Sequence, residues 1–505
     1  MSLIKRDLWR RDAKAAPAQG EIYFAALVAA ACILSFAVLA FRTYSALSNY
    51  DLGTSGLEGP GVLGVIRACQ NRILYRSLLD NPTAMLYNAG FYYFYGMVSR
   101  IFSNCSLSSL LWTKIITSIA FILCAVVINF LGPRPGRWER LLIASLFTSP
   151  VIGWWMFATR PDGMGLLFFT ISAVFIARHL TNGSERWVVM SALALLLAWS
   201  FKQTYAAYLP ALAVPFLIVQ WRAAVRWAVY SGLSIAAGLI VCYVFFGPAY
   251  IEQTIAVNSV IPIAPIQAVL VMLGVIKKLS FFFVVTIGTA GLVWLRLQRS
   301  SWLEVDPPQG RLIKFFAFAL PLIFVLSVVM GARAASADYY LFPVLVAACL
   351  LMLSLPLGRL RRFSAIALAV TLALDSTLVL SGKFGQLVTP DRTLHDRLTA
   401  EIFPFNGNKL VLLDWEALPW FSGQVDPILV DSLIYLTMLR VKPGAIADIY
   451  AEVAANAFDL IVLPDPSSVG PDRAGLEANI RRNLVGRWDQ RTIEGTIILT
   501  RDDEP

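Results

Sequence analysis

The sequence predicts an α-helical polytopic membrane protein with about eleven membrane-spanning helices and a small C-terminal α/β domain. Of its 505 residues, 58% are hydrophobic and only 15% are charged, whereas soluble domains carry about 25% charged residues. Long apolar runs recur up to residue 381, and short strand-like and helix-like segments replace them afterwards. We therefore expect a cytoplasmic N-terminal segment (1–21), a transmembrane domain (22–381) and a soluble domain (382–505).

The first apolar run, 22–41, predicts an uncleaved membrane helix with its N-terminus inside the cell. It is long enough to span a bilayer, and no small-residue cleavage site follows it cleanly. Five basic residues precede it, and basic residues favour the cytoplasmic side. They are Lys5, Arg6, Arg10, Arg11 and Lys14.

The remaining apolar runs fit one orientation across the membrane. They lie near 107–131, 140–158, 163–179, 187–201, 205–221, 226–246, 279–296, 313–331, 339–356 and 363–381. Starting inside, the predicted cytoplasmic loops are 132–140, 179–187, 222–226, 296–314 and 357–362, and every one of them carries basic residues. This agreement supports both the number of helices and their direction.

The first outer loop, 43–106, contains an aromatic and apolar stretch at 87–102. A membrane span there would invert every later helix and place the basic loops outside. We therefore expect amphipathic helices in this loop that lie in the membrane interface, where tyrosine rings are favoured. Residues 264–278 have a similar character.

The C-terminal part differs from the membrane part in both pattern and charge. Apolar runs at 409–415, 458–465 and 495–503 predict strands, and the spacing at 431–440 and 447–457 predicts helices. The net charge is +16 up to residue 381 and −6 from residue 382 onward. The basic excess is typical of cytoplasmic loops and contact with anionic lipid, and it does not indicate nucleic-acid binding. An odd number of helices places residues 382–505 outside.

Cysteine and histidine usage argues against a His/Cys metal site. The two histidines are His179 and His395, and no CxxC pair occurs. The C-terminal domain has no cysteine, so no disulfide framework is expected there. The six cysteines are Cys32, Cys69, Cys105, Cys124, Cys242 and Cys349.

A few charged residues on the predicted outer side are candidates for chemistry. Glu58 precedes a helical stretch, where the helix N-terminus favours an ionised carboxylate that can take a proton from an acceptor. It can equally be a simple helix-end charge. Asp162 follows Arg160 and Pro161 at the mouth of a span, where capping is the alternative role. Acids near a membrane are costly unless paired or functional.

Basic and aromatic residues at the same face suggest a site for a phosphate. Lys202 and Arg333 lie outside, against the positive-inside bias, and can neutralise a lipid phosphate. Snorkelling is the alternative for Lys202. Asp338 and Tyr339 follow Arg333, and interface anchoring also explains the tyrosine.

With these residues the layout resembles the GT-C superfamily of polyprenyl-phosphate-dependent glycosyltransferases, in particular the branch with the aminoarabinose transferase and the protein O-mannosyltransferases. The resemblance covers residues 22–381. It rests on an acid before a helix in a long first outer loop, an R-P-D motif, an F-K-Q-T motif and a G-x-R…D-Y-Y-L motif. Their residues are Glu58, Arg160, Pro161, Asp162, Lys202, Arg333, Asp338 and Tyr339.

The resemblance implies an inverting sugar transfer from a polyprenyl monophosphate to an envelope glycan, lipid or protein at the periplasmic face of a bacterial inner membrane. Glu58 would be the general base, Asp162 would orient the acceptor or the base, and Lys202 and Arg333 would hold the leaving phosphate. Many relatives have Asp or an acidic pair at the first-loop position, so Asp51 is a rival base. No cofactor is expected; without an acidic pair a divalent metal is not favoured.

Two other classes of function fit a membrane protein of this kind. A transporter or flippase of lipid-linked sugars predicts paired repeats and ionisable residues at mid-membrane, and here only Asp375 is placed deep. A non-catalytic subunit of envelope assembly predicts that replacement of Glu58 is harmless.

Overall fold

The computed structural model describes most of the chain. The described residues are 19–48, 58–80, 83–105, 109–261, 263–298, 307–333, 338–355, 359–383, 408–411, 428–429, 443–455, 457–463, 478–493 and 496–501. The predicted helix at 431–440 and the N-terminal basic residues lie outside them.

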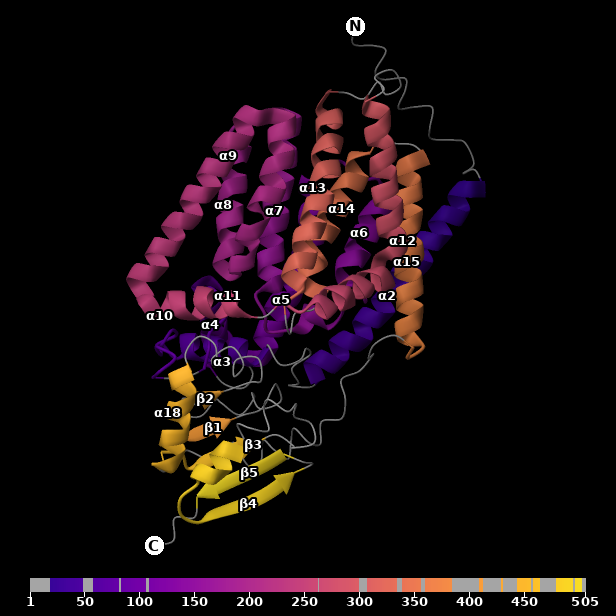
Figure 1. Cartoon of the computed structure of the whole chain (residues 1–505). Helices are drawn as coiled ribbons and strands as arrows, with labels where there is room; N and C mark the ends of the chain where they lie inside the picture. The colour runs from indigo at the N-terminus through magenta and orange to yellow at the C-terminus, as the bar shows by residue number, and fades with distance from the viewer. Residues whose placement is uncertain are drawn as a thin grey trace.

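A bundle of long apolar helices forms the larger part of the molecule (Figure 1). Six described helical stretches are long and apolar enough to cross a membrane, and two shorter apolar helices accompany them. The predicted class is therefore confirmed, whereas the number of about eleven spans stays a prediction. The bundle helices are α2 (Gln19–Ser48), α5 (Ser109–Leu131), α6 (Arg137–Thr148), α7 (Asp162–Asn182), α8 (Arg186–Phe201), α9 (Leu209–Phe246), α12 (Pro265–Gln298), α13 (Pro307–Gly331), α14 (Phe342–Ser354) and α15 (Arg359–Leu380).

Three of these helices differ from the sequence-based expectation. Helix α12 has 34 residues and joins most of the stretch 264–278 to the run predicted at 279–296. Helix α6 has 12 residues, about 18 Å at 1.5 Å per residue, which is shorter than the bilayer core. It ends because Ser149 is extended and Pro150 cannot continue a helix. A 3-10 turn, η2 (Gly153–Phe157), then replaces the end of the expected span at 140–158. Helix α9 is broken at Gln220, whose backbone is not helical, so it carries both runs predicted at 205–221 and 226–246.

The C-terminal part forms a five-stranded sheet with the order β2-β1-β3-β5-β4. The central pairs β1–β2 and β1–β3 are parallel, and β3–β5 and β5–β4 are antiparallel. A helix, α18 (Pro443–Ala454), accompanies the sheet. The strands are β1 (Lys409–Val411), β2 (Ile428–Leu429), β3 (Leu460–Leu463), β4 (Trp488–Ile493) and β5 (Thr496–Arg501). This confirms the predicted α/β character, and β4 is a strand that the sequence pattern did not indicate.

The sheet packs on the first loop rather than standing apart. Leu78 and Leu86 of that loop share one buried cluster with Leu410 of β1 and Ile446 of α18. Figure 1 shows the sheet at the end of the bundle where α3 (Glu58–Cys69) and α4 (Ala89–Ser103) lie. This shared core fixes the sheet on the side of the bundle from which α7 begins.

Helix α4 covers the stretch predicted at 87–102 to be an amphipathic helix. Its 15 residues, about 22 Å, are too few to cross a bilayer core. Phe91, Tyr92 and Tyr95 are fully buried, whereas Ile101 and Phe102 are exposed. The helix is therefore amphipathic, as expected, and its place in a membrane interface stays a prediction.

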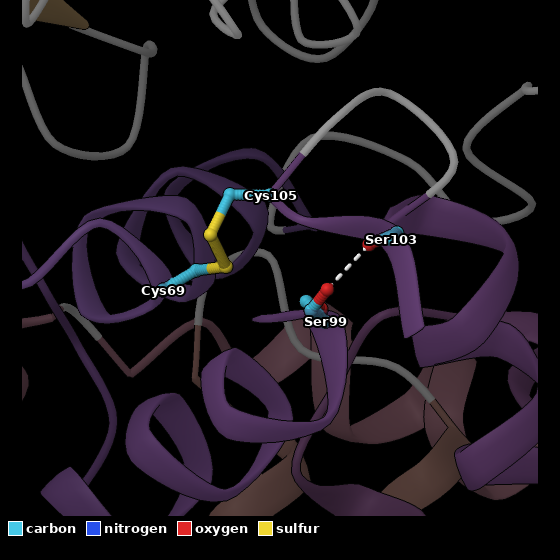
Figure 2. Close-up of a disulfide and its surroundings, with 4 residues drawn as sticks. All are labelled: Cys69, Ser99, Ser103 and Cys105. Carbon is cyan, nitrogen blue, oxygen red and sulfur yellow. Dashed lines mark hydrogen bonds between the residues drawn. A yellow bond between two sulfur atoms is a disulfide. The ribbon is translucent and has the colours of Figure 1, made fainter. Parts of the chain in front are cut away.

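A disulfide that the sequence did not indicate joins the two helices of the first loop. Cys69 at the end of α3 bonds to Cys105 just after α4, with 5.8 Å between their Cα atoms (Figure 2). Next to it, the Ser103 hydroxyl donates a hydrogen bond to the carbonyl oxygen of Ser99. Gly96 permits the close approach, because an added Cβ there would lie 2.9 Å from the backbone nitrogen of Cys69. The bond closes a loop of 36 residues.

Replacing Cys69 by Ser should destabilise the first loop, because a cross-link of this length restricts the unfolded chain and contributes about 2–4 kcal/mol. We expect a lower unfolding temperature by tryptophan fluorescence of the purified full chain, and wild-type protein under reducing conditions should match the variant. An unchanged unfolding temperature, together with two reactive thiols in the oxidised wild type, would contradict this disulfide.

Candidate active site

A buried cluster of charges surrounds Asp162 at the start of α7. One carboxylate oxygen lies 3.1 Å from Nε of Arg160, and the other lies 2.5 Å from Nζ of Lys202. All three side chains are buried, with exposed fractions of 2–5%. Asp162 does not cap its helix, because Pro161 occupies the N-cap position without a side-chain cap bond. The carboxylate is therefore committed to the two cations.

Lys202 reaches Asp162 because the chain changes direction between two helical segments. Helix α8 ends at Phe201, Lys202 is extended, and the 3-10 helix η3 (Gln203–Tyr208) follows. The side chain points into the protein and its ammonium group pairs with Asp162. The snorkelling interpretation is therefore wrong, since the amino group does not extend to solvent.

Aromatic rings cover both cations. The ring of Tyr339, in η5 (Asp338–Leu341), lies 4.3 Å from Cζ of Arg160 and 4.1 Å from Nζ of Lys202. Trp155 lies 4.9 Å from Arg160, and Tyr340 lies 4.5 Å from Lys202. Desolvated contacts of this kind stabilise by about 2 kcal/mol each. Tyr339 was predicted from the sequence and Trp155 was not; the available signal was the group of aromatic residues Trp154, Trp155 and Phe157.

Tyrosines of the first loop complete the surroundings of Arg160. The hydroxyl of Tyr87 accepts a hydrogen bond from Nη2 of Arg160 at 3.1 Å. Tyr95 of α4 donates to the backbone carbonyl of Arg160 at 3.4 Å. Burial raises the pKa of Tyr95 above its ordinary value, so its hydroxyl stays protonated and available as a donor. The first loop therefore contacts the charge cluster directly, through residues that were predicted only as interface aromatics.

Amide side chains hold the loop segment that carries Tyr87. Gln203 and Asn258 both donate to the carbonyl oxygen of Leu86, at 2.6 and 3.0 Å. Gln253 accepts a hydrogen bond from the backbone nitrogen of Met85 at 2.7 Å. Asn258 belongs to α11 (Val257–Val260), and Gln253 to the preceding π-helix η4 (Glu252–Ala256). These bonds fix the loop beside Lys202.

Glu58, the candidate base, is the first residue of α3, and its side chain lies outside the described part of the structure. The first turn of α3 lies close to the charge cluster, because an added Cβ on Gly61 would be 3.1 Å from the carbonyl oxygen of Thr159. Thr159 directly precedes Arg160. The backbone therefore brings the helix of Glu58 next to the R-P-D turn, while its role as base stays a prediction. The rival base Asp51 lies outside the described residues.

The other predicted substrate-binding residues are placed less directly. Arg333 is half-buried and donates a hydrogen bond to the carbonyl oxygen of Asn258 at 3.0 Å. Among the described residues, no ion pair or hydrogen bond joins Arg333 to Asp162, and the link to the cluster runs through Asn258 and Leu86. Asp338 begins η5 beside Tyr339, and its side chain is outside the described part. Phosphate binding by Arg333 thus stays a prediction.

Within the described residues, no group of three or more His, Cys, Asp or Glu side chains gathers in a way that could hold a metal ion. The side chains of Glu58, Asp51 and Asp338 lie outside the described part of the structure. Metal independence therefore stays a prediction.

Comparison with solved structures identifies the fold. No family model matches the chain, and no curated protein matches it in sequence. ArnT from Cupriavidus metallidurans bound to undecaprenyl phosphate is similar with a TM-score of 0.56 at 12% identity, over 94% of this chain and 97% of ArnT. Its apo form gives 0.55 at 12% identity, over 95% and 98%. The archaeal oligosaccharyltransferase AglB from Archaeoglobus fulgidus gives 0.48 at 10%, over 96% and 75%.

The chain therefore has the fold of the GT-C membrane proteins, as the sequence motifs indicated. The similarity to ArnT includes the C-terminal part, since it covers nearly the whole of both chains.

A double-mutant cycle tests whether Asp162 and Lys202 form one buried unit. Asp162→Asn alone should destabilise the protein by about 3–5 kcal/mol, because it leaves buried cations uncompensated. Adding Lys202→Met should restore part of this loss, so the double variant should lose less than the sum of the single variants. Unfolding of the purified protein in denaturant measures the four free energies.

The surface pair Arg226–Glu185 provides a matched control. Its side chains are 51% and 44% exposed and 2.8 Å apart. Glu185→Gln should cost about 0–1 kcal/mol, because water screens an exposed ion pair. Strict additivity at Asp162 and Lys202, with single-variant costs as small as that of Glu185→Gln, would contradict a buried unit.

Proposed function

We propose that this protein is a membrane glycosyltransferase that moves a sugar from a polyprenyl-phosphate donor to an envelope glycan, lipid or protein. The observation that carries the proposal is the buried Arg160–Asp162–Lys202 cluster beside the first outer loop of a GT-C fold. ArnT, the structural neighbour with a TM-score of 0.56, was crystallised with undecaprenyl phosphate. A phosphate monoester on a lipid is the kind of ligand that basic side chains at a membrane surface attract.

The proposed reaction is a single displacement with inversion at the sugar carbon. Glu58 takes the proton of the acceptor hydroxyl or amine while that atom attacks the sugar. The bond between the sugar carbon and the phosphate oxygen breaks, and its electron pair stays on the phosphate. Lys202 and Arg333 stabilise the charge that develops there. A lysine ammonium has three donors, so Lys202 can keep its bond to Asp162 while it contacts phosphate.

Asp162 acts in this proposal mainly by positioning. Its bonds to Arg160 and Lys202 set the direction of both cations, and Arg160 in turn contacts Tyr87 of the first loop. Because the three side chains are nearly buried, the electrostatic field around them is stronger than in water. The reaction needs no cofactor, and the partners are the lipid-linked sugar, the acceptor and the bilayer.

The proposed location is a bacterial inner membrane with the N-terminus in the cytoplasm and the site and C-terminal domain in the periplasm. The Cys69–Cys105 disulfide supports this orientation. Disulfides persist in oxidising compartments such as the periplasm, and this one joins the helices that lie next to the Asp162 cluster.

Glu58→Gln should abolish most sugar transfer while the protein remains folded. Loss of a general base typically costs about 10²–10⁴-fold in rate. Mass spectrometry of envelope glycans and lipids, from cells with and without the protein, identifies the product; its amount then measures each variant. Asp80→Asn is the matched control, because Asp80 is an exposed acid of the same loop.

Three outcomes of that comparison are informative. Full sugar transfer by the Glu58→Gln variant would indicate either that Asp51 is the general base or that the protein is a transporter or a non-catalytic subunit. An envelope profile that does not depend on the protein at all would count against transfer. Loss with both Glu58→Gln and Asp80→Asn would indicate a general sensitivity of the loop.

Accessibility of single cysteines tests the orientation. Asp80 and Arg140 are exposed residues at opposite ends of the bundle. In intact cells, a membrane-impermeant maleimide should label Asp80→Cys more strongly than the unaltered chain and should leave Arg140→Cys at background until the membrane is opened. The reverse pattern would place the site in the cytoplasm and overturn the proposed location.

A further inference from the structure

A pocket lined by both basic and apolar side chains lies at the end of the bundle opposite to Asp162. Its volume is about 670 Å³, within the usual range of ligand sites, about 300–1,000 Å³. Thr181 and Asn182, at the end of α7, line it. The 21 residues of α7 place it about 30 Å from Asp162, which is the thickness of a bilayer core. The pocket and the candidate active site therefore lie at opposite membrane surfaces.

The described lining of this pocket contains three arginines and no acidic residue. Arg361 is neutralised, because it forms two hydrogen bonds to Glu139 at 2.6 and 3.0 Å. Arg134 and Arg178 form no ion pair with any carboxylate in the described part of the chain. The pocket thus carries two arginines that have no carboxylate partner in the described part of the chain.

Hydrogen bonds fix the side chain of Arg178 and the main chain of Arg134. Arg178 donates to the carbonyl oxygens of Leu131 and Phe130, at 2.5 and 3.2 Å, where α5 ends. The carbonyl of Arg134 accepts a bond from Arg361 at 2.9 Å, while the Arg134 side chain is exposed. Prolines on both sides of Arg134 restrict its loop further. The cost of ordering the Arg178 guanidinium is therefore already met in the free protein, and the main chain that carries Arg134 is fixed.

Apolar side chains lie next to the arginines and extend to the outer surface of the bundle. Leu131, Leu312 and Leu353 belong to the pocket lining. Leu131 is 37% exposed, and its neighbour Phe130 is 69% exposed. A ligand that combines a phosphate with an acyl chain can contact both kinds of surface, whereas a free phosphate compound can use only the arginines.

We propose that this pocket, at the surface opposite to the active site, binds the phosphate head group of an anionic phospholipid. Basic pockets between transmembrane helices at the membrane surface bind such head groups. Arg134 and Arg178 contact the phosphate, and the acyl chain lies along Leu131 and Phe130. This lipid differs from the sugar donor, which belongs at the other surface.

Lipid titration of the purified full chain, followed by native mass spectrometry, tests this site. The probes are phosphatidylglycerol and, as the zwitterionic comparison, phosphatidylcholine. Arg134→Gln should weaken the tightest phosphatidylglycerol binding by about fivefold, the effect of about one basic residue, and Arg134→Lys should retain most of it. Arg140→Gln, a matched exposed arginine at the same end, should leave it unchanged.

Equal losses in Arg134→Gln and Arg140→Gln would overturn the proposal, because they would indicate general surface charge. No preference for phosphatidylglycerol over phosphatidylcholine would overturn it too. Glycerol 3-phosphate separates the two sources of phosphate. If it binds alone as tightly as the lipid and depends on Arg134, the occupant is a soluble phosphate compound and the lipid proposal fails; if millimolar amounts do not displace the lipid, the acyl chain contributes as proposed.

Discussion

The contact of Asp162 with Arg160 and Lys202 is the interaction on which the arrangement of the site depends. It joins the start of α7 to the end of α8, and the rings of Tyr339 and Trp155 extend the contact to η5 and η2. A buried ion pair of this kind is costly to form and still more costly to break, because either partner alone would remain charged in a medium of low dielectric constant. The cluster therefore specifies one relative position for several segments.

The first loop connects this cluster to the C-terminal sheet. Tyr87 contacts Arg160, while Leu78 and Leu86 belong to the hydrophobic core of the sheet. The Cys69–Cys105 disulfide and the amide bonds to Leu86 restrict the same loop. The C-terminal part thus contributes to the environment of the candidate site through a segment of chain that packs against both.

Helix α7 separates two surfaces with different chemistry. At its start, one carboxylate shares two cations under a cover of aromatic rings. At its end, Arg178 donates a hydrogen bond to the last carbonyl of α5, and the side chain of Arg134 is exposed. Helix C-termini carry about half a negative charge, so an arginine at that end stabilises the helix.

The fold class and several candidate residues could be predicted from sequence. The length of apolar runs, the charge bias of loops and short motifs are all properties of residues close together in the chain. They indicated the membrane class and the α/β end, and they selected Asp162 and Lys202, which the structure brings into contact. They left open whether Asp162 caps its helix and whether Lys202 snorkels, and they missed the Cys69–Cys105 bond, although both cysteines lie in one outer loop. Those points depend on which residues distant in sequence share a buried space, and only the packing of the helices, which excludes water from the ion pair, decided them.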